Sequence, residues 1–437
     1  MGPLEWRSCG NGVECADLEV PLDHDHPDGW RITLGLARVP ATDGASRLGS
    51  VLINPGGPGA SGVELVLGGF RLDARTMAHY DLVGFDPRGV GRSEALRCEP
   101  DLVSQPLPDP SPDTPAEVDQ LDRQARAIAE RCAETDGDRL AFLGSDSVAR
   151  DLDLLREALG DDRLNYYGLS YGTLLGLRYL ERFPERAGRI VLDGVVDPEA
   201  DLAVLLRQQA VAVERVFGEE AAACAQRSDC PPGGLLAAFD EALRLVEDAP
   251  VDGAGPAEVA TAGFLSTYDP GFWQPLARAL GDAVADGDLT MLDRLSDLYH
   301  GSAAFAPYAA VTCSDTPVPR GPAAWDALVD ELTRASPRFG PALGNELRTC
   351  AYWPVSTDRP PRAVRAAGSG PVLVIGTTGD AATPLDNAVR VSRQLANGHL
   401  LVHDGAGHTA VGDPCVDEVV GRFLVDGELP APDERCS

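Results

Sequence analysis

The chain has 437 residues, of which 44% are hydrophobic, and its formal net charge at pH 7 is -31. This length exceeds one typical domain and allows a large core. The negative charge argues against nucleic acid or an anionic membrane as a partner, because both attract basic surfaces. No apolar run of about eighteen residues occurs, so we expect no membrane-spanning helix.

The amino-terminal third of the chain predicts β-strands that lead into glycine-rich loops. Partial alternation of apolar and polar residues at 30–40 indicates a strand, and short apolar strands run into loops at 49–62 and 80–93. The proline- and aspartate-rich stretch at 104–117 predicts an exposed loop.

The middle of the chain alternates between helix and strand. Apolar residues at 145–160 recur at helical spacing. Ser145 or Ser147 can cap the start of this helix, and Gly160 can end it. A strand, a helix and a second strand are then predicted at 163–170, 171–184 and 188–198. Such alternation predicts a mostly parallel sheet covered by helices.

The pattern becomes mostly helical after residue 198 and alternates again near the carboxyl terminus. Strand, helix, strand and helix are predicted at 370–380, 384–396, 398–403 and 415–427. We therefore expect an α/β core with a helical cap inserted between two of its strands. The expected division is core at 1–198, helical cap at 199–365 and core again at 366–437.

The cysteines fall into five local pairs along the chain. These pairs are Cys9 with Cys15, Cys98 with Cys132, Cys224 with Cys230, Cys313 with Cys350, and Cys415 with Cys436. The pattern favours short-range disulfides and an oxidising compartment over free buried thiols. No cysteine–histidine spacing fits structural zinc, so no metal is expected. The stretch MGPLEWRSCG lacks the apolar run of a signal peptide, and we expect the mature form of an exported protein.

The stretch Gly168-Leu169-Ser170-Tyr171-Gly172 lies where a predicted strand meets a predicted helix. A serine between two glycines at such a junction can be a nucleophile presented on a sharp turn. The alternative is an ordinary helix cap at Ser170. Serine attacks poorly unless a base, an acid that orients the base and donors for the oxyanion lie near it.

Residues suited to act as acid and base follow later strands. Asp380 comes directly after an apolar strand, and His408 lies in a glycine-rich loop beyond the last strand. The order Ser170, Asp380, His408 is the nucleophile–acid–base order of α/β-hydrolases.

Both roles have rivals. His403 stands at a strand end without flanking glycines, and Asp404 follows it directly. Asp386 fits the first turn of a helix, where a carboxylate is a normal partner of the helix dipole. His24 and His26 are expected in an exposed turn near the amino terminus.

Backbone amides are the expected oxyanion donors. One is the amide of Tyr171, next to the nucleophile, and the other is that of Gly57 in an early glycine-rich loop. We expect Asp86 and Arg88 to form a structural ion pair that supports this loop. Their own glycine-rich stretch lacks the Gly-Lys-Ser/Thr ending of a phosphate-binding loop.

The chain resembles a known family over most of its predicted core. The motifs in family order are GGPGASG, YDLVGFDPRGVGRS, YYGLSYGTLLGLRYLERFP, VLDGVVDP, GTTGDAATP and GAGHTAV. They are similar to those of the secreted actinobacterial tripeptidyl aminopeptidases, in the prolyl-iminopeptidase-like branch of the α/β-hydrolases, and of mycobacterial exported proteases and carboxylesterases. The likeness covers residues 4–200 and 370–437 and is thin across the helical insertion.

The resemblance implies a secreted serine hydrolase that uses Ser170, Asp380 and His408, and no cofactor, to release short peptides from free amino termini. Pro55 stands where prolyl iminopeptidases have histidine, which disfavours strict specificity for amino-terminal proline. A carboxylate must then bind the substrate ammonium, and Glu64, close after the glycine-rich loop, is one candidate beside the acids of the cap. A monomer is expected.

Two other functions remain open at the level of the sequence. A carboxylesterase, or a hydrolase of natural-product esters or amides, can use the same triad. A non-catalytic binding protein can also be built on a hydrolase fold.

Overall fold

The structure is a computed structural model that describes residues 4–98, 109–247, 251, 254–301, 304–357 and 359–437. Residues 104–108 of the predicted loop at 104–117 therefore lie outside the described residues. The rest of that stretch has no regular structure up to Thr114, and its last residues form the first turn of a long helix. Within the described residues, no helix combines the length and apolar character needed to cross a membrane.

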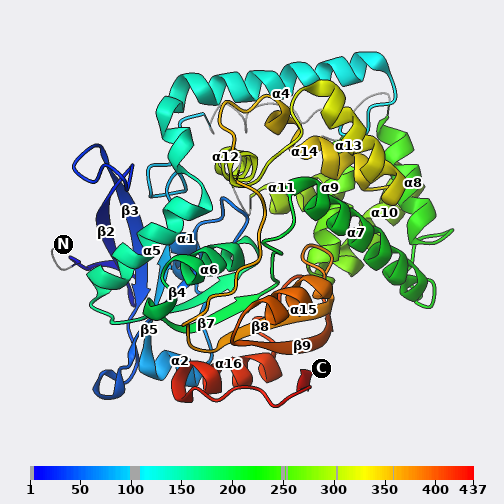
Figure 1. The fold of residues 1–437 in the computed structure, drawn as a ribbon. Helices are drawn as coiled ribbons and strands as arrows, with labels where there is room; N and C mark the ends of the chain where they lie inside the picture. Colours follow the sequence, from blue (N-terminus) through cyan, green and yellow to red (C-terminus); the bar gives the residue numbers. More distant parts are fainter. Residues whose placement is uncertain (1–3, 99–108, 248–250, 252–253, 302–303, 358) are drawn as a thin grey trace.

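A ten-stranded sheet runs through the molecule in the order β1-β2-β3-β5-β4-β6-β7-β8-β9-β10 (Figure 1). The strands are β1 Arg7–Gly10, β2 Val13–Pro21, β3 Arg31–Val39, β4 Gly49–Asn54, β5 Tyr80–Phe85, β6 Leu164–Leu169, β7 Ala187–Asp193, β8 Val372–Gly379, β9 Gly398–Ala406 and β10 Arg435–Cys436. The strands from β5 to β10 in this order pair in parallel, and β1, β2 and β3 add an antiparallel extension next to β5.

The central strands are buried on both faces, which explains their continuous apolar sequences. Successive side chains of a strand point to opposite faces. Leu52 of β4 accordingly belongs to one buried cluster, whereas its neighbours Val51 and Ile53 belong to the other. Tyr166 and Tyr167 of β6 divide in the same way, and both side chains are fully buried.

Helices cover both faces of the sheet. Those of the core are α1 Gly62–Leu67, α2 Ala74–His79, α5 Ser145–Leu159, α6 Tyr171–Arg182, α15 Leu385–Gln394 and α16 Pro414–Asp426. Residues of α5, α6 and α15 share one buried cluster, and residues of α1, α2 and α16 share the other. The expected sheet with helices on both faces is confirmed, and the architecture is that of the α/β-hydrolases.

A second group of helices lies between β7 and β8 in the chain and beside the sheet in space (Figure 1). Its members are α7 Leu202–Cys224, α8 Leu235–Val246, α9 Pro256–Tyr268, α10 Trp273–Asp286, α11 Thr290–His300, α12 Phe305–Asp315, α13 Pro322–Ala335, α14 Gly340–Glu346 and the short turn η5 Arg348–Ala351. We call this group, together with its connecting loops, the helical segment.

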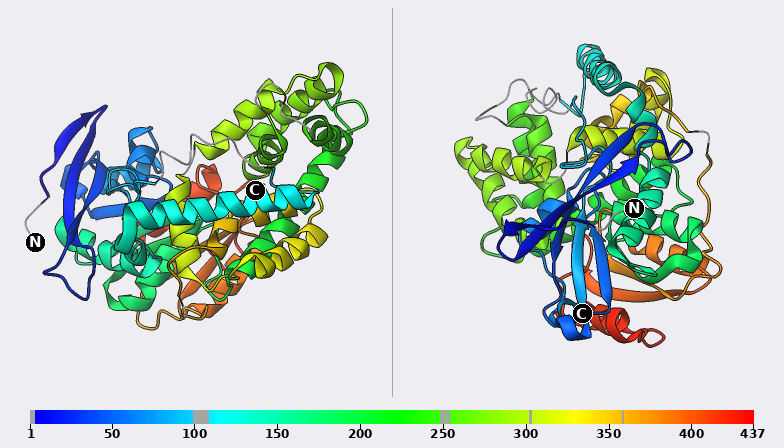
Figure 2. Two further views of the ribbon diagram at one scale, coloured as in Figure 1. Left: turned by 90° about the horizontal axis from the view of Figure 1, so that it is seen from above. Right: turned by 90° about the vertical axis from the view of Figure 1, so that its left-hand side faces the viewer.

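One long helix between α2 and α5 in the chain also packs against the helical segment. Helix α4, Pro115–Asp136, runs lengthwise from the core to that segment (Figure 2). Arg348 of η5 donates to Asp122 at 2.7 Å, and the Thr349 hydroxyl donates to the carbonyl of Ala125 at 3.0 Å. The helical segment is therefore held by α4 as well as by its own two chain connections.

The five expected cysteine pairs are all disulfides in the structure, and no described cysteine is free. The Cys313–Cys350 bond joins α12 to η5 inside the helical segment. The Cys415–Cys436 bond ties the terminal strand β10 to the start of α16.

Two local predictions were wrong. Helix α5 is capped by Gly144 without a side-chain hydrogen bond, so neither Ser145 nor Ser147 is its cap. The Ser145 amide and hydroxyl instead donate to Asp315 of α12, while Gly160 ends the helix in the left-handed conformation as expected. His24 is also not in an exposed turn, because its side chain is 6% exposed and contacts the buried carboxylate of Asp151 at 2.9 Å.

Candidate active site

Ser170 stands on a sharp turn between β6 and α6. Its φ is positive, at 55°, and its ψ is -125°, a backbone conformation that a residue with a side chain rarely adopts. A Cβ at Gly168 would lie 2.4 Å from the Gly172 carbonyl oxygen, and a Cβ at Gly172 would lie 2.7 Å from that of Asn54. The two glycines are therefore required by close backbone contacts. The Ser170 side chain makes no capping hydrogen bond to α6, which argues against the alternative of an ordinary helix cap.

His408 and Asp380 form a directly hydrogen-bonded pair. The Nδ1 atom of His408 lies 2.9 Å from Oδ2 and 3.0 Å from Oδ1 of Asp380. The Asp380 carboxylate is fully buried and also accepts from the amides of Ala382 and Thr383, each at 2.8 Å. Because Nδ1 donates to the carboxylate, the lone pair of His408 is on Nε2. That atom is buried and has no hydrogen-bond partner within the described residues.

The electrostatics of the pair favour a basic imidazole. Burial opposes the charged form of His408, but the negative charge and hydrogen bond of Asp380 outweigh it and raise the pKa of His408 above its ordinary value. Asp193 adds to this effect by its charge. Burial itself raises the pKa of Asp193 to about 7.

Asp193 is a site residue that the sequence reading missed. It ends β7, between the strand of Ser170 and the strand of Asp380. Its carboxylate accepts from the Ala410 amide at 3.0 Å, and its backbone carbonyl accepts from the Ser170 amide at 2.9 Å. One residue therefore fixes both the serine turn and the loop that carries His408. The sequence feature that could have indicated this role is the position of Asp193 at the end of an apolar strand.

The glycine-rich loop after β4 lies against the serine turn. A Cβ at Gly56 would lie 2.9 Å from the Cβ of Ser170 and 3.0 Å from the amide nitrogen of Tyr171. Gly57 and Tyr171 both line the cavity in front of Ser170. Neither of their amides donates a hydrogen bond within the part of the chain that the structure describes, so both are free for an oxyanion.

The loop is supported by Asp86, although not as expected. The Asp86 carboxylate accepts from the hydroxyl of Ser61 and from the amide of Val63 at the start of α1. Arg88 does not pair with Asp86; its guanidinium binds Asp151 through two nitrogen–oxygen contacts of 2.7 and 2.8 Å. The predicted Asp86–Arg88 ion pair is therefore wrong, because Arg88 is the buried partner of a carboxylate on α5.

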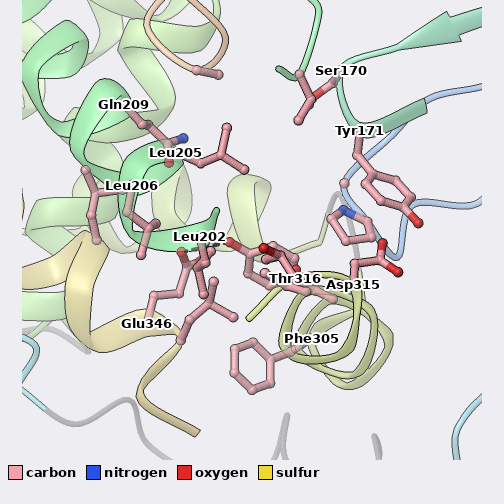
Figure 3. A pocket seen from close by; sticks show the side chains of 18 of the residues that line it. Ser170, Tyr171, Leu202, Leu205, Leu206, Gln209, Phe305, Asp315, Thr316 and Glu346 are labelled. Carbon is pink, nitrogen blue, oxygen red and sulfur yellow. Dashed lines mark hydrogen bonds between the residues drawn. The ribbon is translucent and has the colours of Figure 1, made fainter. Parts of the chain in front are cut away.

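A large cavity of about 1110 Å³ connects the serine turn to the helical segment. Ser170 and His408 line it from the core, and residues of α7, α9, α11, α12 and α14 line it from the other side. Figure 3 shows Ser170 across the open space from Glu346, with Leu202, Leu205 and Leu206 along the wall. The cavity is thus mostly apolar, with a nucleophilic side chain at one end and a carboxyl group at the other.

The remaining candidates lie elsewhere. Glu64 is on the outer side of α1, 66% exposed and 3.6 Å from Arg92, and it does not line the cavity. Its place in the structure therefore gives the predicted substrate contact no support. Asp404 pairs with Arg435 at the surface, and His403 contacts Thr377 rather than the serine turn.

Comparisons with known proteins show which proteins this chain is similar to. Residues 336–436 match the model of a family described as TAP-like protein. The chain is 36% identical to the serine protease Hip1 of Mycobacterium tuberculosis, over 99% of this chain and 91% of that protein. It is 38% identical to carboxylesterase B of the same organism, over 99% and 89%. It is 33% identical to the tripeptidyl aminopeptidase of Streptomyces lividans, over 99% and 86%.

Proposed function

Because the chain belongs to the α/β-hydrolase family of serine peptidases that includes Hip1 and the Streptomyces tripeptidyl aminopeptidases, we propose that Ser170, His408 and Asp380 are its catalytic triad. The observation that carries the proposal is that a strained serine turn and a hydrogen-bonded His408–Asp380 pair face one cavity. The substrate that fits best is a short peptide with a free amino terminus, from which a tripeptide is released.

The proposed reaction is acyl transfer through the serine hydroxyl. Nε2 of His408 takes the proton of Ser170 as its oxygen attacks the peptide carbonyl, and Asp380 stabilises the imidazolium that forms. The amides of Gly57 and Tyr171 hold the oxyanion. His408 then gives the proton to the leaving amine. Water, activated by the same histidine, releases the amino-terminal peptide from the acyl-enzyme.

The helical segment favours short substrates and chain ends. It lies beside the sheet, and α7, α9, α11, α12 and α14 form the cavity walls opposite the core. A folded protein chain does not fit into such a space, whereas a terminal peptide does. The five disulfides favour action outside the cytoplasm, where such bonds persist.

Ester hydrolysis is the second candidate function. The apolar wall formed by Leu202, Leu206 and Phe264 suits an acyl chain as well as a peptide. A relative with 38% identity is named a carboxylesterase. The chemistry at Ser170 is the same for both substrates, so only the preferred acyl group distinguishes them.

The test uses labelling and cleavage together. A fluorophosphonate probe should label the protein and should not label Ser170→Ala; labelling of Ser170→Ala at the unchanged rate contradicts the proposed nucleophile. A peptide library with free amino termini should be shortened by three residues at a time, as read by mass spectrometry. Equal cleavage of amino-terminally acetylated peptides contradicts the aminopeptidase proposal and favours the esterase.

A further inference from the structure

Glu346 is an acidic group in the cavity wall, and among the described residues no arginine or histidine pairs with it. It is the last residue of α14, where the negative end of the helix dipole disfavours an anion. The hydrogen bond its carboxylate accepts comes from the hydroxyl of Tyr308, at 3.4 Å. Arg348, two residues further on, is committed to Asp122 and Asp326 at 2.7 and 2.6 Å. A carboxyl group in such a place costs stability, so a role in binding explains it better than a structural role.

Three tyrosines line the cavity together with this carboxyl group, and each comes from a different helix. Tyr268 ends α9, Tyr299 lies in α11 and Tyr308 in α12, and all three line the same cavity as Glu346. Burial and then the negative charge of Glu346 raise the pKa of each phenol, so each ring lies within the electrostatic field of that carboxylate. The rings of Tyr268 and Tyr299 meet edge to face, with centroids 6.1 Å apart.

We propose that Glu346, Tyr268, Tyr299 and Tyr308 form a cage for the α-ammonium group of the peptide substrate. A carboxylate supplies the countercharge for a primary ammonium, and aromatic rings and phenol oxygens add cation–π and hydrogen-bond contacts. This assignment rests on the proposed function, because it concerns the far end of a substrate whose carbonyl is attacked by Ser170. In this proposal Glu346 binds the substrate's amino terminus in place of Glu64, which lies on the outer surface.

The titration of Glu346 agrees with a site for a cation. Burial raises the pKa of Glu346 to about 7, so in the empty cavity its carboxyl group is partly protonated at neutral pH. A bound ammonium stabilises the carboxylate and lowers that pKa again. The carboxyl group is thus partly ionised when the cavity is empty, and it forms an ion pair when the ammonium is bound.

The cage also borders the proposed base. The backbone carbonyl of Tyr268 accepts from the His408 amide at 2.7 Å, and the two rings meet edge to face with centroids 5.1 Å apart. Tyr268 therefore contacts His408 on one side and belongs to the cage on the other. This places the proposed ammonium site and the proposed base on two sides of one ring.

The test compares substrates with and without the amine. Glu346→Gln keeps the size of the side chain and removes its charge. We expect KM for a tripeptide p-nitroanilide with a free amino terminus to rise roughly 10- to 100-fold, the loss typical of a hydrogen bond to a charged group. Hydrolysis of the desamino analogue and of p-nitrophenyl acetate, which lack the ammonium, should change little. Asp297→Asn removes another carboxylate from the same cavity lining and should leave all three substrates unchanged.

The outcomes separate the cage from the proposed function. Unchanged KM for the free tripeptide in Glu346→Gln overturns the cage, whereas failure of the wild-type protein to cleave free tripeptides overturns the proposed function. Fluorophosphonate labelling of Ser170 reports whether a variant is folded. If Glu346→Gln does not fold, Tyr308→Phe is the second variant, with a severalfold rise in KM for the free tripeptide only. The cage is also overturned if the wild-type protein has the same KM for the free peptide and for its desamino analogue.

Discussion

The geometry of His408 and Asp380 fixes the pH range in which the proposed base can work. His408 must be neutral at Nε2 to accept the serine proton. Its pKa is raised, because the charge of Asp380 outweighs the effect of burial. A raised pKa means that the imidazole is protonated, and therefore inactive, up to a higher pH than an ordinary histidine. Activity should thus fall as the pH drops through the pKa of His408, above its ordinary 6.5.

Asp380→Asn tests this assignment. Removing the charge should lower kcat by about four orders of magnitude, as in other serine–histidine–aspartate sites. It should also shift the acid limb of kcat/KM to lower pH, because the cause of the raised pKa is gone. The measurement is the pH profile of ester hydrolysis. Asp404→Asn, at a carboxylate that pairs with Arg435 at the surface, is the matched control. An acid limb that stays in place in Asp380→Asn contradicts the assignment.

Much of the residue-level site could be predicted from local signals, and the rest depends on packing. Ser170, Asp380 and His408 each follow a strand that the sequence shows, and the structure brings all three to the same edge of the sheet. Asp193 lies in the motif VLDGVVDP, which does not show what its side chain contacts, and Glu346 lies in none of the six motifs. Their roles depend on which distant groups surround them, the Ala410 amide and the Tyr308 hydroxyl, and no local pattern encodes those contacts.

At the scale of elements, the loop after β4 should tolerate no side chain at Gly56. A Cβ there would lie 2.6 Å from the Leu169 carbonyl oxygen and 2.9 Å from the Cβ of Ser170, so the loop must move away from the serine turn. We expect Gly56→Ala to lower kcat/KM for an ester at least tenfold, because the Gly57 amide moves with the loop. The measurement is kcat/KM of the variant and of the wild type, determined from initial rates of ester hydrolysis.

Gly69→Ala is the control for this substitution. Gly69 has a φ of 100°, close to the 96° of Gly56, but a Cβ there meets nothing within 4 Å. Both variants carry the backbone strain of about 1–2 kcal/mol that a left-handed residue costs. Equal losses of activity in the two variants show that strain alone, and not contact with the serine turn, accounts for the effect.

The sequence predicted where helices and strands begin and end better than it predicted which side chains contact each other between them. The strands that carry the site and the helix ending at Gly160 follow from hydrophobic periodicity and glycine. Helix α4 was missed, although Thr114 and Glu117 form a capping box at its start, because the proline-rich stretch before it dominated the local pattern. Arg88 was assigned to the wrong carboxylate, because sequence distance does not show that Asp151 lies beside it.

At the scale of the whole molecule, the disulfides should differ in their contribution to stability. The Cys98–Cys132 bond closes a sequence separation of 34 residues and the Cys224–Cys230 bond one of 6. In the chain-entropy model, removing them costs about 4 and about 2 kcal/mol, respectively. Urea unfolding of the two double Cys→Ala variants measures this difference. If both variants lose the same free energy of unfolding, or if the Cys224–Cys230 variant loses more, the entropy of the unfolded chain does not explain the stabilisation by these disulfides.

The chain order of the site has a consequence for biosynthesis. Ser170 emerges from the ribosome long before Asp380 and His408, and β9, β10 and α16 complete the sheet only with the last residues. A nascent or truncated chain therefore holds the proposed nucleophile without the proposed base. The Cys415–Cys436 bond, which ties the final strand to α16, forms only after oxidation. The proposed triad is thus complete only when the whole chain has been made.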